Sequence, residues 1–431
     1  MAHEMLPADV EAVMTTVVVH CGETQAKAFP VAELPDVATH GVGLSPVADA
    51  FDVGGSIDTD QSLARPDGDL RLIPDLGNVR FLGGIPGWAW APADRYHQDG
   101  SPYEGDQRLF LRRMLAAVAD AGLSASAGFE IEWNVGLDRD EFVPGVAGSP
   151  YSAQRLLSGG SYANDVMSAL ATAGVPVQQF HAENAPGQLE VSLPPRDPLT
   201  AADDVVLAKL VIAAVTDHHG LRPTFSPVVA PGLTGNGGHL HVSFARDGVP
   251  LFGGGSESGG LTSEGASMVA GLLRHLPGLL AVTAPLEVSY LRLQPHRWAG
   301  AFQVWGVENR EAPLRLIPGG APVRASLEIK CADLVANPYL FVGSALALAL
   351  SGLREPNPLP EPVVGDPADG DHPRLPAALG AAVDRFRADE VLRTALGEQL
   401  HRTVAENRDA EVRRAASLDV EDLIASTRWW R

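Results

Sequence analysis

The feature that most constrains this chain is a pair of polar residues, two positions apart, that recurs in four otherwise apolar segments. The segments are AGFEIEWNV, GQLEVSLPP, GHLHVSF and SLEIKCADL. Each has the length and the apolar content of a β-strand. Because residues two apart share one face of a strand, each segment would bury an apolar face and present two polar side chains on the other. The pattern predicts a sheet with one strongly polar face.

The polar residues of these segments are of the types that bind hard metal ions. They are Glu130 and Glu132, Gln188 and Glu190, His239 and His241, and Glu328 and Lys330. Unpaired charges are costly to bury, so a cation is expected among them. Oxygen-rich ligands with an imidazole favour Mg²⁺ or Mn²⁺, whereas the absence of a ligand-spaced cysteine pair argues against zinc. The alternative is that these are solvent-facing residues of amphipathic strands, which explains one such pair better than four together.

Composition excludes several classes of partner. The chain has 431 residues, of which 53 are acidic and 32 basic, for a net charge of −21. This sign argues against a general nucleic-acid binder and against docking on anionic lipid. The two cysteines and an N-terminus without signal-peptide features fit a cytoplasmic protein, and no apolar run is expected to approach the ~20 residues that a membrane span needs. Scarce lysine beside 29 arginines suggests a bacterial source.

Further segments predict an α+β protein of two or three domains. Residues 14–33 read as two short strands around a Gly-Glu turn, and the Pro-, Gly- and aromatic-rich segment 87–105 as a domain junction. Periodicity predicts helices in four places: residues 106–122, with Asp106 as N-cap and Gly122 as stop, 202–217, 263–281 and 339–353.

Taken in order, six segments resemble the signature segments of the glutamine synthetase superfamily. They are AGFEIEWNV, HAENAPGQLEVS, GNGGHLHVSF, SYLRLQP, WGVENREAPLR and SLEIKCADLVANPYL. The match extends from about Gly68 to about Leu353. The resemblance implies an N-terminal β-grasp domain, placed here at residues 1–97, and a catalytic domain at residues 98–431. In the latter, a funnel of antiparallel strands is surrounded by helices.

The resemblance also implies ATP as co-substrate and two or more divalent metal ions, Mg²⁺ or Mn²⁺. Carried over by motif, the ligands would be Glu132, Glu183 and Glu190 for the first metal and Glu130, His239 and Glu328 for the second. Phosphoryl transfer needs charge neutralisation and positioning, which metals and arginines supply.

The same carry-over assigns substrate and nucleotide contacts. His241 and Ser243 fall where the family contacts nucleotide. Arg292 matches the arginine that holds the α-carboxylate of glutamate, and Arg310 and Arg315 match arginines that stabilise transferred phosphate and contact nucleotide. The predicted substrate-binding residues are Glu132, Gly235, Gly237, Arg292, Trp298 and Lys330.

Trp298 is the departure that bears most on function. In ammonium-using members, the segment after SYLRLQP carries a glutamate that helps bind and deprotonate ammonium. Here the continuation is PHRWAGAF, with Trp298 in its place. An indole cannot accept a proton but can pack on a carbon skeleton or hold an alkylammonium by cation–π contact. A core or interface tryptophan is the alternative.

Three other departures affect neighbouring contacts. Ser326 and Lys330 replace two arginines around the metal glutamate Glu328, with Arg324 as a candidate substitute, and Thr234 replaces an asparagine before the glycine-rich loop. No tyrosine occurs in the Pro-rich stretch after Leu353, where some members are adenylylated.

The family completes its active site with an aspartate from a neighbouring subunit, and Asp52 and Asp58 are the candidates here. The resemblance thereby implies a homo-oligomer, hexameric rings or a dodecamer.

These features predict an ATP-dependent ligase that joins the γ-carboxylate of L-glutamate to a primary amine through a γ-glutamyl phosphate. The alternatives are an ordinary glutamine synthetase that uses ammonium and a catalytically silent structural or regulatory member of the family.

Overall fold

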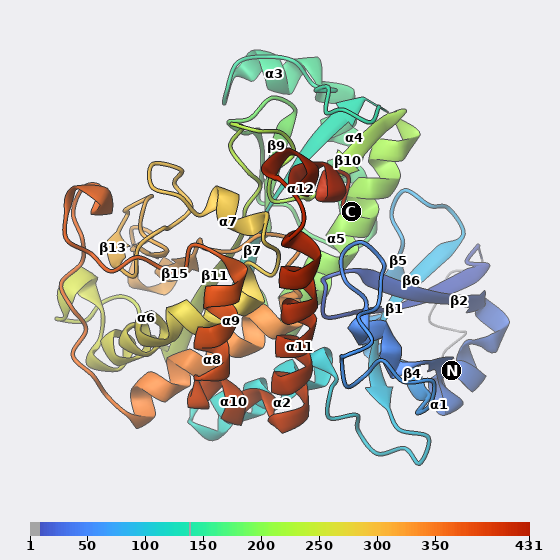
Figure 1. Ribbon diagram of the computed structural model, residues 1–431, viewed down its shortest axis with the longest axis horizontal. Coiled ribbons are helices and arrows are strands. Elements are labelled where there is room, and N and C mark those ends of the chain that lie inside the picture. Colours follow the sequence, from blue (N-terminus) through green and yellow to red (C-terminus); the bar gives the residue numbers. More distant parts are fainter. Residues whose placement is uncertain (1–8, 138) are drawn as a thin grey trace.

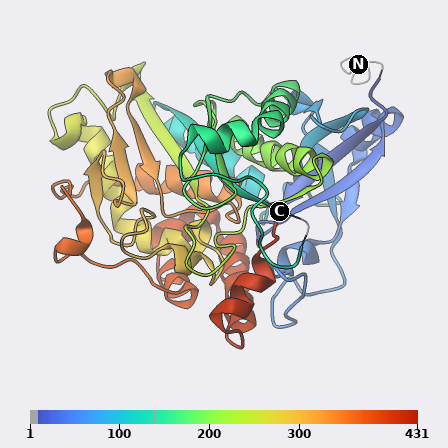
Figure 2. The same cartoon turned by 90° about the horizontal axis from the view of Figure 1, so that it is seen from above.

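Two sheets and a large set of helices make up the computed structural model, which describes residues 9–137 and 139–431. Figures 1 and 2 both show the N-terminal strands at one end of the molecule and strands β13–β15 at the other, with helices packed around the larger sheet. About 39% of the residues are helical and 21% are in strands. The predicted α+β class is confirmed.

A six-stranded sheet forms the N-terminal part of the chain, in the order β2-β1-β6-β4-β3 with β5 on β6. Its strands are β1 (Ala12–Val18), β2 (Thr24–Pro30), β3 (Val42–Leu44), β4 (Leu70–Pro74), β5 (Arg80–Phe81) and β6 (Trp88–Tyr96). The predicted hairpin is present as β1 and β2. Helix α1 (Leu34–His40) packs Leu34 and Val37 on this sheet. The parallel β1–β6 pair forms its centre, as in a β-grasp arrangement.

The interpretation of residues 87–105 as a domain junction is wrong for most of the segment. Residues 88–96 form β6, which pairs with β1, β4 and β5 and is largely buried. Trp90 is fully buried in the core, with its indole N–H donating to Thr16, and Trp88 packs against the same core. The division of the chain at residues 97 and 98 stays a prediction.

A nine-stranded sheet carries the motifs, in the order β13-β14-β15-β11-β7-β9-β8 with β10 on β7 and β12 on β11. Its strands are β7 (Leu123–Leu137), β8 (Gln179–Ala182), β9 (Gln188–Ser192), β10 (Leu221–Thr224), β11 (Gly238–Arg246), β12 (Val249–Pro250), β13 (Trp305–Val307), β14 (Leu314–Ile317) and β15 (Ser326–Ile329). The four strands predicted from their polar pairs are consecutive neighbours, β15-β11-β7-β9, and all of these pairings are antiparallel.

The helices that follow the N-terminal sheet pack around the larger sheet, against its strands or against one another. They are α2 (Gln107–Asp120), α3 (Ala153–Ser158), α4 (Gly160–Thr172), α5 (Pro198–His218), α6 (Ser263–Thr283), α7 (Ser289–Arg292), α8 (Pro338–Arg354), α9 (Leu379–Arg387), α10 (Glu390–Leu396), α11 (Glu398–Ala415) and α12 (Val420–Thr427). The four predicted helices correspond to α2, α5, α6 and α8. Asp106 caps α2 by accepting from the Leu109 amide, as expected.

The expectation that no apolar segment is long enough to cross a membrane is wrong for α6. This 21-residue helix passes on length and composition, but 72% of its apolar window is buried in the fold. It packs on α8 and α9, so it is a core helix.

Five buried or half-buried aspartates and three arginines link β6, α2 and α5 with the loops of the N-terminal sheet. This junction cluster consists of Asp49, Asp75, Asp94, Asp106 and Asp203 with Arg95, Arg108 and Arg112. Arg108 alone contacts three of the carboxylates at 2.7–2.9 Å. The cluster ties the N-terminal sheet to the helices that support the larger sheet.

Candidate active site

The register of the larger sheet brings the predicted polar residues together. His239 lies opposite Glu130, His241 opposite Glu328, and Glu132 opposite Glu190. Their side chains share one face, and all of them except His241 line a cavity of about 490 Å³, whereas His241 lines a cavity that adjoins it. Five carboxylates, from Glu130, Glu132, Glu183, Glu190 and Glu328, contribute to this cavity and are called the funnel carboxylates below.

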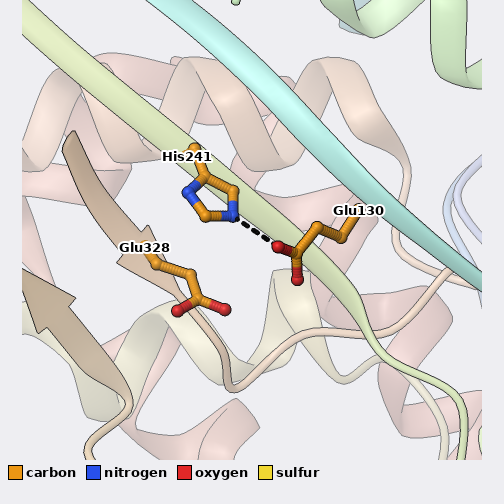
Figure 3. Close-up of side chains that lie close together, drawn as sticks. All are labelled: Glu130, His241 and Glu328. Carbon is orange, nitrogen blue, oxygen red and sulfur yellow. Dashed lines mark hydrogen bonds and ion pairs between the residues drawn. The ribbon is translucent and has the colours of Figure 1, made fainter. Parts of the chain in front are cut away.

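One candidate metal cluster consists of Glu130, His241 and Glu328, whose ligand atoms all lie within 4.8 Å of one another. Figure 3 shows the three side chains converging from neighbouring strands, with His241 Nε2 3.2 Å from Glu130 Oε1. The predicted ligand His239 is also present: its Nδ1 lies 2.9 Å from Glu130 and 3.2 Å from Glu328. Both histidines of the HLH motif are thus within reach of this cluster.

The second cluster consists of His181, Glu183 and Glu190, again within 4.8 Å. Sequence reasoning missed His181, although it stands two residues before Glu183 and thus repeats the pattern used for the other strands. Glu132 lies beside the cluster, and its carboxylate accepts from Gln188 Nε2 at 2.8 Å and from the Gly237 amide at 2.9 Å. Carboxylate oxygens with one imidazole in each cluster fit Mg²⁺ or Mn²⁺.

The pKa values of the funnel carboxylates diverge. Burial opposes ionisation of Glu130, yet the bonds from His239 and His241 hold its pKa well below the usual range. Burial, reinforced by the neighbouring carboxylates, raises the pKa of Glu190 well above the usual range. Burial also raises the pKa of Glu132. The site therefore has a carboxylate excess that a bound cation would relieve.

The predicted glutamate-binding residues line one side of the cavity. Arg292, at the end of α7, is buried, with Nη2 3.1 Å from His239 Nε2 and donating to the Lys330 carbonyl at 3.2 Å. Gly235 lies against the Arg292 side chain. At Gly237, a Cβ atom would lie 2.3 Å from His239 Nε2, so glycine permits the close approach of the loop. The structure thus brings Arg292, Gly235 and Gly237 together.

The predicted phosphate-side residues line the same cavity from β14, β15 and the turn before β14. Arg310 is exposed, whereas Arg315 donates to Glu328 at 3.2 Å and also pairs with Glu308. The Nε atom of Arg315 is buried and has no partner among the described residues, which fits an anionic ligand. Lys330, which replaces a family arginine, is buried and donates to Glu328 at 3.2 Å.

A second cavity of about 660 Å³ adjoins the first at Glu130 and Gln179. It is lined by the predicted nucleotide-contacting residues His241 and Ser243, together with Arg324 and Ser326. Ser243 Oγ donates to the Ala325 carbonyl at 2.8 Å. Thr234 lines the first cavity instead, and its hydroxyl donates to Asn184 at 2.8 Å.

Trp298 lies at the rim of the first cavity with 55% of its surface exposed. The alternative of a core tryptophan is therefore wrong. Its neighbours His296 and Arg297 line the same rim.

Neither Asp52 nor Asp58 lines the cavity of this chain. The Asp52 carboxylate accepts from the amides of Gly54 and Ser56, and Asp58 pairs with Arg413 at 2.5 Å. Their predicted catalytic role requires a neighbouring subunit and stays a prediction.

Residues 104–423 match the catalytic domain of glutamine synthetase. The chain belongs to the glutamine synthetase family. A relative from Streptomyces coelicolor, the gamma-glutamylpolyamine synthetase GlnA3, is 45% identical, with 99% of this chain and 95% of that relative covered. The glutamine synthetase of Thermus thermophilus is 31% identical, with 80% of each protein covered.

Solved structures agree. A structure described as a novel glutamine synthase homologue superposes with a TM-score of 0.88 at 31% identity, covering 97% of this chain and 98% of that one. An ADP complex of GmaS superposes with a TM-score of 0.86 at 28% identity, covering 96% and 95%. The glutamine synthetase fold predicted for the chain is thereby confirmed.

Proposed function

We propose that the acceptor used by this protein is a primary amine larger than ammonium, with a polyamine as the first candidate. The chain is an ATP-dependent ligase of the glutamine synthetase family, and the proposal concerns what its cavity joins to L-glutamate. Two features support it: the 45% identity with the gamma-glutamylpolyamine synthetase over nearly the whole chain, and the exposed indole of Trp298 at the cavity rim.

Trp298 is the observation that carries the proposal. By the family resemblance, this position holds a glutamate in ammonium-using members. An exposed aromatic face offers contact area and cation–π attraction to an alkylammonium, but no proton acceptor for NH₄⁺. Ammonium itself, which has no carbon skeleton, gains little contact area from this indole.

In the proposed reaction, a γ-carboxylate oxygen of glutamate attacks the terminal phosphorus of ATP, and the bond from phosphorus to the bridging oxygen of ADP breaks. The neutral amine nitrogen then attacks the carbonyl carbon of γ-glutamyl phosphate. The carbon–oxygen bond to phosphate breaks, and the nitrogen loses a proton. An amide, ADP and phosphate are the products.

The residues of this chain bind and orient the reactants. We assign Arg292 to the α-carboxylate of glutamate and Arg310 and Arg315 to the transferred phosphate, with His241 and Ser243 on the nucleotide side. Divalent metal ions held by the two clusters would neutralise phosphate charge. Arginine suits these roles because its planar fork binds carboxylate or phosphate through two bonds.

An ordinary glutamine synthetase is the second candidate, because the six metal-ligand positions of the family carry Glu or His and three of its arginines, Arg292, Arg310 and Arg315, are retained. A catalytically silent member is disfavoured for the same reason. We also propose a cytoplasmic homo-oligomer of hexameric rings or a dodecamer, in which Asp52 or Asp58 reaches the cavity of a neighbouring subunit.

An amine panel tests the acceptor. Purified protein with ATP, Mg²⁺ or Mn²⁺ and glutamate is supplied with ammonium, methylamine, ethanolamine or putrescine, and phosphate release is measured. We expect one of the organic amines, putrescine first, to give the highest kcat/KM. Highest turnover with ammonium would contradict the proposal.

Trp298→Glu sharpens this test, because it restores a carboxylate at the rim. We expect the ratio of ammonium use to putrescine use to rise about tenfold, since one charged contact is gained and the aromatic contact is lost. Leu157→Glu is the matched control, because Leu157 is 74% exposed and does not line the cavity. An unchanged ratio in Trp298→Glu would show that Trp298 does not face the amine.

A further inference from the structure

Three consecutive residues, His296, Arg297 and Trp298, form one edge of the cavity and are called the rim strap. His296 has φ +62° and Trp298 has φ +56°. Residues with a Cβ atom are strained in this left-handed region, and such strain persists only where the surroundings hold the backbone in place. The position of the Trp298 indole therefore depends on contacts that fix the strap.

Each residue of the rim strap has one polar contact, called its tether, with another segment of the described chain. His296 Nδ1 lies 2.9 Å from Asp366 Oδ2, and Arg297 donates to the Gly232 carbonyl at 3.3 Å. The Trp298 amide donates to Glu311 Oε1 at 3.1 Å. The first two tethers come from exposed side chains. The third acts directly on the strained backbone, through a residue only 8% exposed.

Glu311 is itself held in place. Its amide donates to Asn309 Oδ1 at 3.1 Å, while Asn309 Nδ2 donates to the carbonyls of Val363 and Gly365. After the strap, Gly300 packs so closely on Pro313 that a Cβ atom would lie 2.6 Å from it. The turn carrying Glu311 thus packs against the rim strap, while the adjacent Arg310 lines the cavity.

We propose that Glu311 is a positioning residue that holds the Trp298 indole at the cavity rim and so sets the preference for the amine acceptor. Without this acceptor, the amide of Trp298 loses its only hydrogen-bond partner among the described residues, and the strained peptide can relax, carrying the indole away from the amine. The inference rests on the proposed function, because it takes Trp298 to face the amine. Glu311 does not itself line the cavity, so its effect is transmitted through the strap.

Three substitutions separate the hydrogen bond from charge and bulk. Glu311→Ala removes the acceptor, and Glu311→Asp keeps the charge but withdraws the oxygen by one methylene. Glu311→Gln keeps an oxygen that accepts from the Trp298 amide. The matched control is Glu287→Ala, because Glu287 also accepts one backbone N–H, from Leu379 at 3.0 Å, and lies outside the cavity lining.

The measurement is steady-state phosphate release with putrescine, glutamate and ATP varied in turn. Glu311→Ala and Glu311→Asp should raise the KM for putrescine about tenfold, as expected for losing a hydrogen bond to a charged group, while the KM values for glutamate and ATP change less than about twofold. Glu311→Gln should stay within about twofold of the wild type for all three. Melting temperatures of the same samples report folding.

Two results would overturn this inference and leave the proposed function intact. One is a wild type active with putrescine beside Glu311 variants that shift the putrescine KM no more than Glu287→Ala does. The other is Glu311→Gln behaving like Glu311→Ala, which would assign the effect to charge. If Glu311→Ala does not fold, Glu311→Asp and Glu311→Gln decide the question. A wild type without amine-dependent turnover would overturn the proposed function and this inference together.

Discussion

Two clusters of buried or half-buried carboxylates in the molecule differ in how their charge is neutralised. In the junction cluster every carboxylate contacts an arginine, at distances between 2.7 and 3.2 Å. Among the funnel carboxylates, only Glu328 pairs with an arginine or lysine within the described part of the chain. The others contact histidines or neutral donors.

The pKa values of the carboxylates in the two clusters reflect this difference. Burial alone would raise the pKa of Asp49, but Arg95 and His20 hold it below the usual range, and Arg108 does the same for Asp75. Asp106, which also pairs with Arg95, differs from these two, because burial raises its pKa. Burial raises the pKa values of Glu132 and Glu190, neither of which forms an ion pair with an arginine. Removing one partner of a buried ion pair destabilises a fold, whereas the funnel carboxylates without a basic partner could hold a cation.

We expect the largest effect on activity from substitution of a funnel carboxylate. Glu190→Gln keeps the shape but removes a charge, and we expect kcat/KM to fall by about 10²–10³ because charge stabilisation in the site is lost. The metal-free variant should unfold at the same or a higher temperature than the wild type, since burial penalises the charged form. Glu257→Gln, an exposed carboxylate outside the cavity, is the control. A clear loss of stability in Glu190→Gln would place Glu190 with the junction carboxylates.

The opposite outcome is expected in the junction cluster. Asp203→Ala leaves Arg108 without a carboxylate that it contacts through two nitrogens at 3.0 and 2.9 Å. Breaking a buried pair costs about 3–5 kcal/mol, to be measured as the free energy of unfolding in denaturant. Turnover per folded molecule should be unchanged. Loss of turnover without loss of stability would contradict the contrast between the two regions.

Divalent metal ions should stabilise the folded protein only by binding to the funnel carboxylates. A ligand at about 100 times its Kd raises the free energy of unfolding by about 2.7 kcal/mol, so Mg²⁺ or Mn²⁺ should raise the melting temperature and a chelator should reverse the change. Asp203→Ala should respond like the wild type, and Glu190→Gln much less. Equal responses in all three proteins would mean that the metal binds elsewhere.

Lowering the pH should first destabilise the fold at the junction cluster, where His20 Nδ1 lies 3.7 Å from Asp49. Burial lowers the pKa of His20 to about 4 from an ordinary 6.5. Because the unfolded chain then binds the proton more tightly, stability falls as the pH drops below the unfolded value and continues to fall until the folded one. From about pH 6.5 to about pH 5.5 the loss should be about 1 kcal/mol. His20→Gln should lose this component of the pH dependence, and an identical slope in wild type and variant would exclude His20 as its source.

The sequence predicts much of this arrangement because local patterns carry it. Alternation in four segments identified the strands and their polar face, and family motifs supplied the identities of Glu130, Glu190, Glu328 and Arg292. Helices α2, α5, α6 and α8 were predictable from periodicity and, for α2, from its Asp106 cap.

The rest depends on contacts between distant segments. The consecutive order β15-β11-β7-β9 is set by tertiary pairing, which no single strand encodes. His181 was within reach of the same alternation argument, but β8 is only four residues long and its pattern is short. The contact between Glu311 and the Trp298 amide joins residues on two loops, so only the folded chain reveals it. The aromatic segment around Trp90 was misjudged because its residues are typical of both loops and buried strands.

The central claim is that the cavity activates the γ-carboxylate of glutamate for attack by an amine. Glutamate labelled with a heavy oxygen isotope in that carboxylate, incubated with ATP, Mg²⁺ and putrescine, tests it directly by mass spectrometry of the released phosphate. The account predicts that each phosphate gains one labelled oxygen and that the amide retains the other. Phosphate released without label in step with product would contradict it.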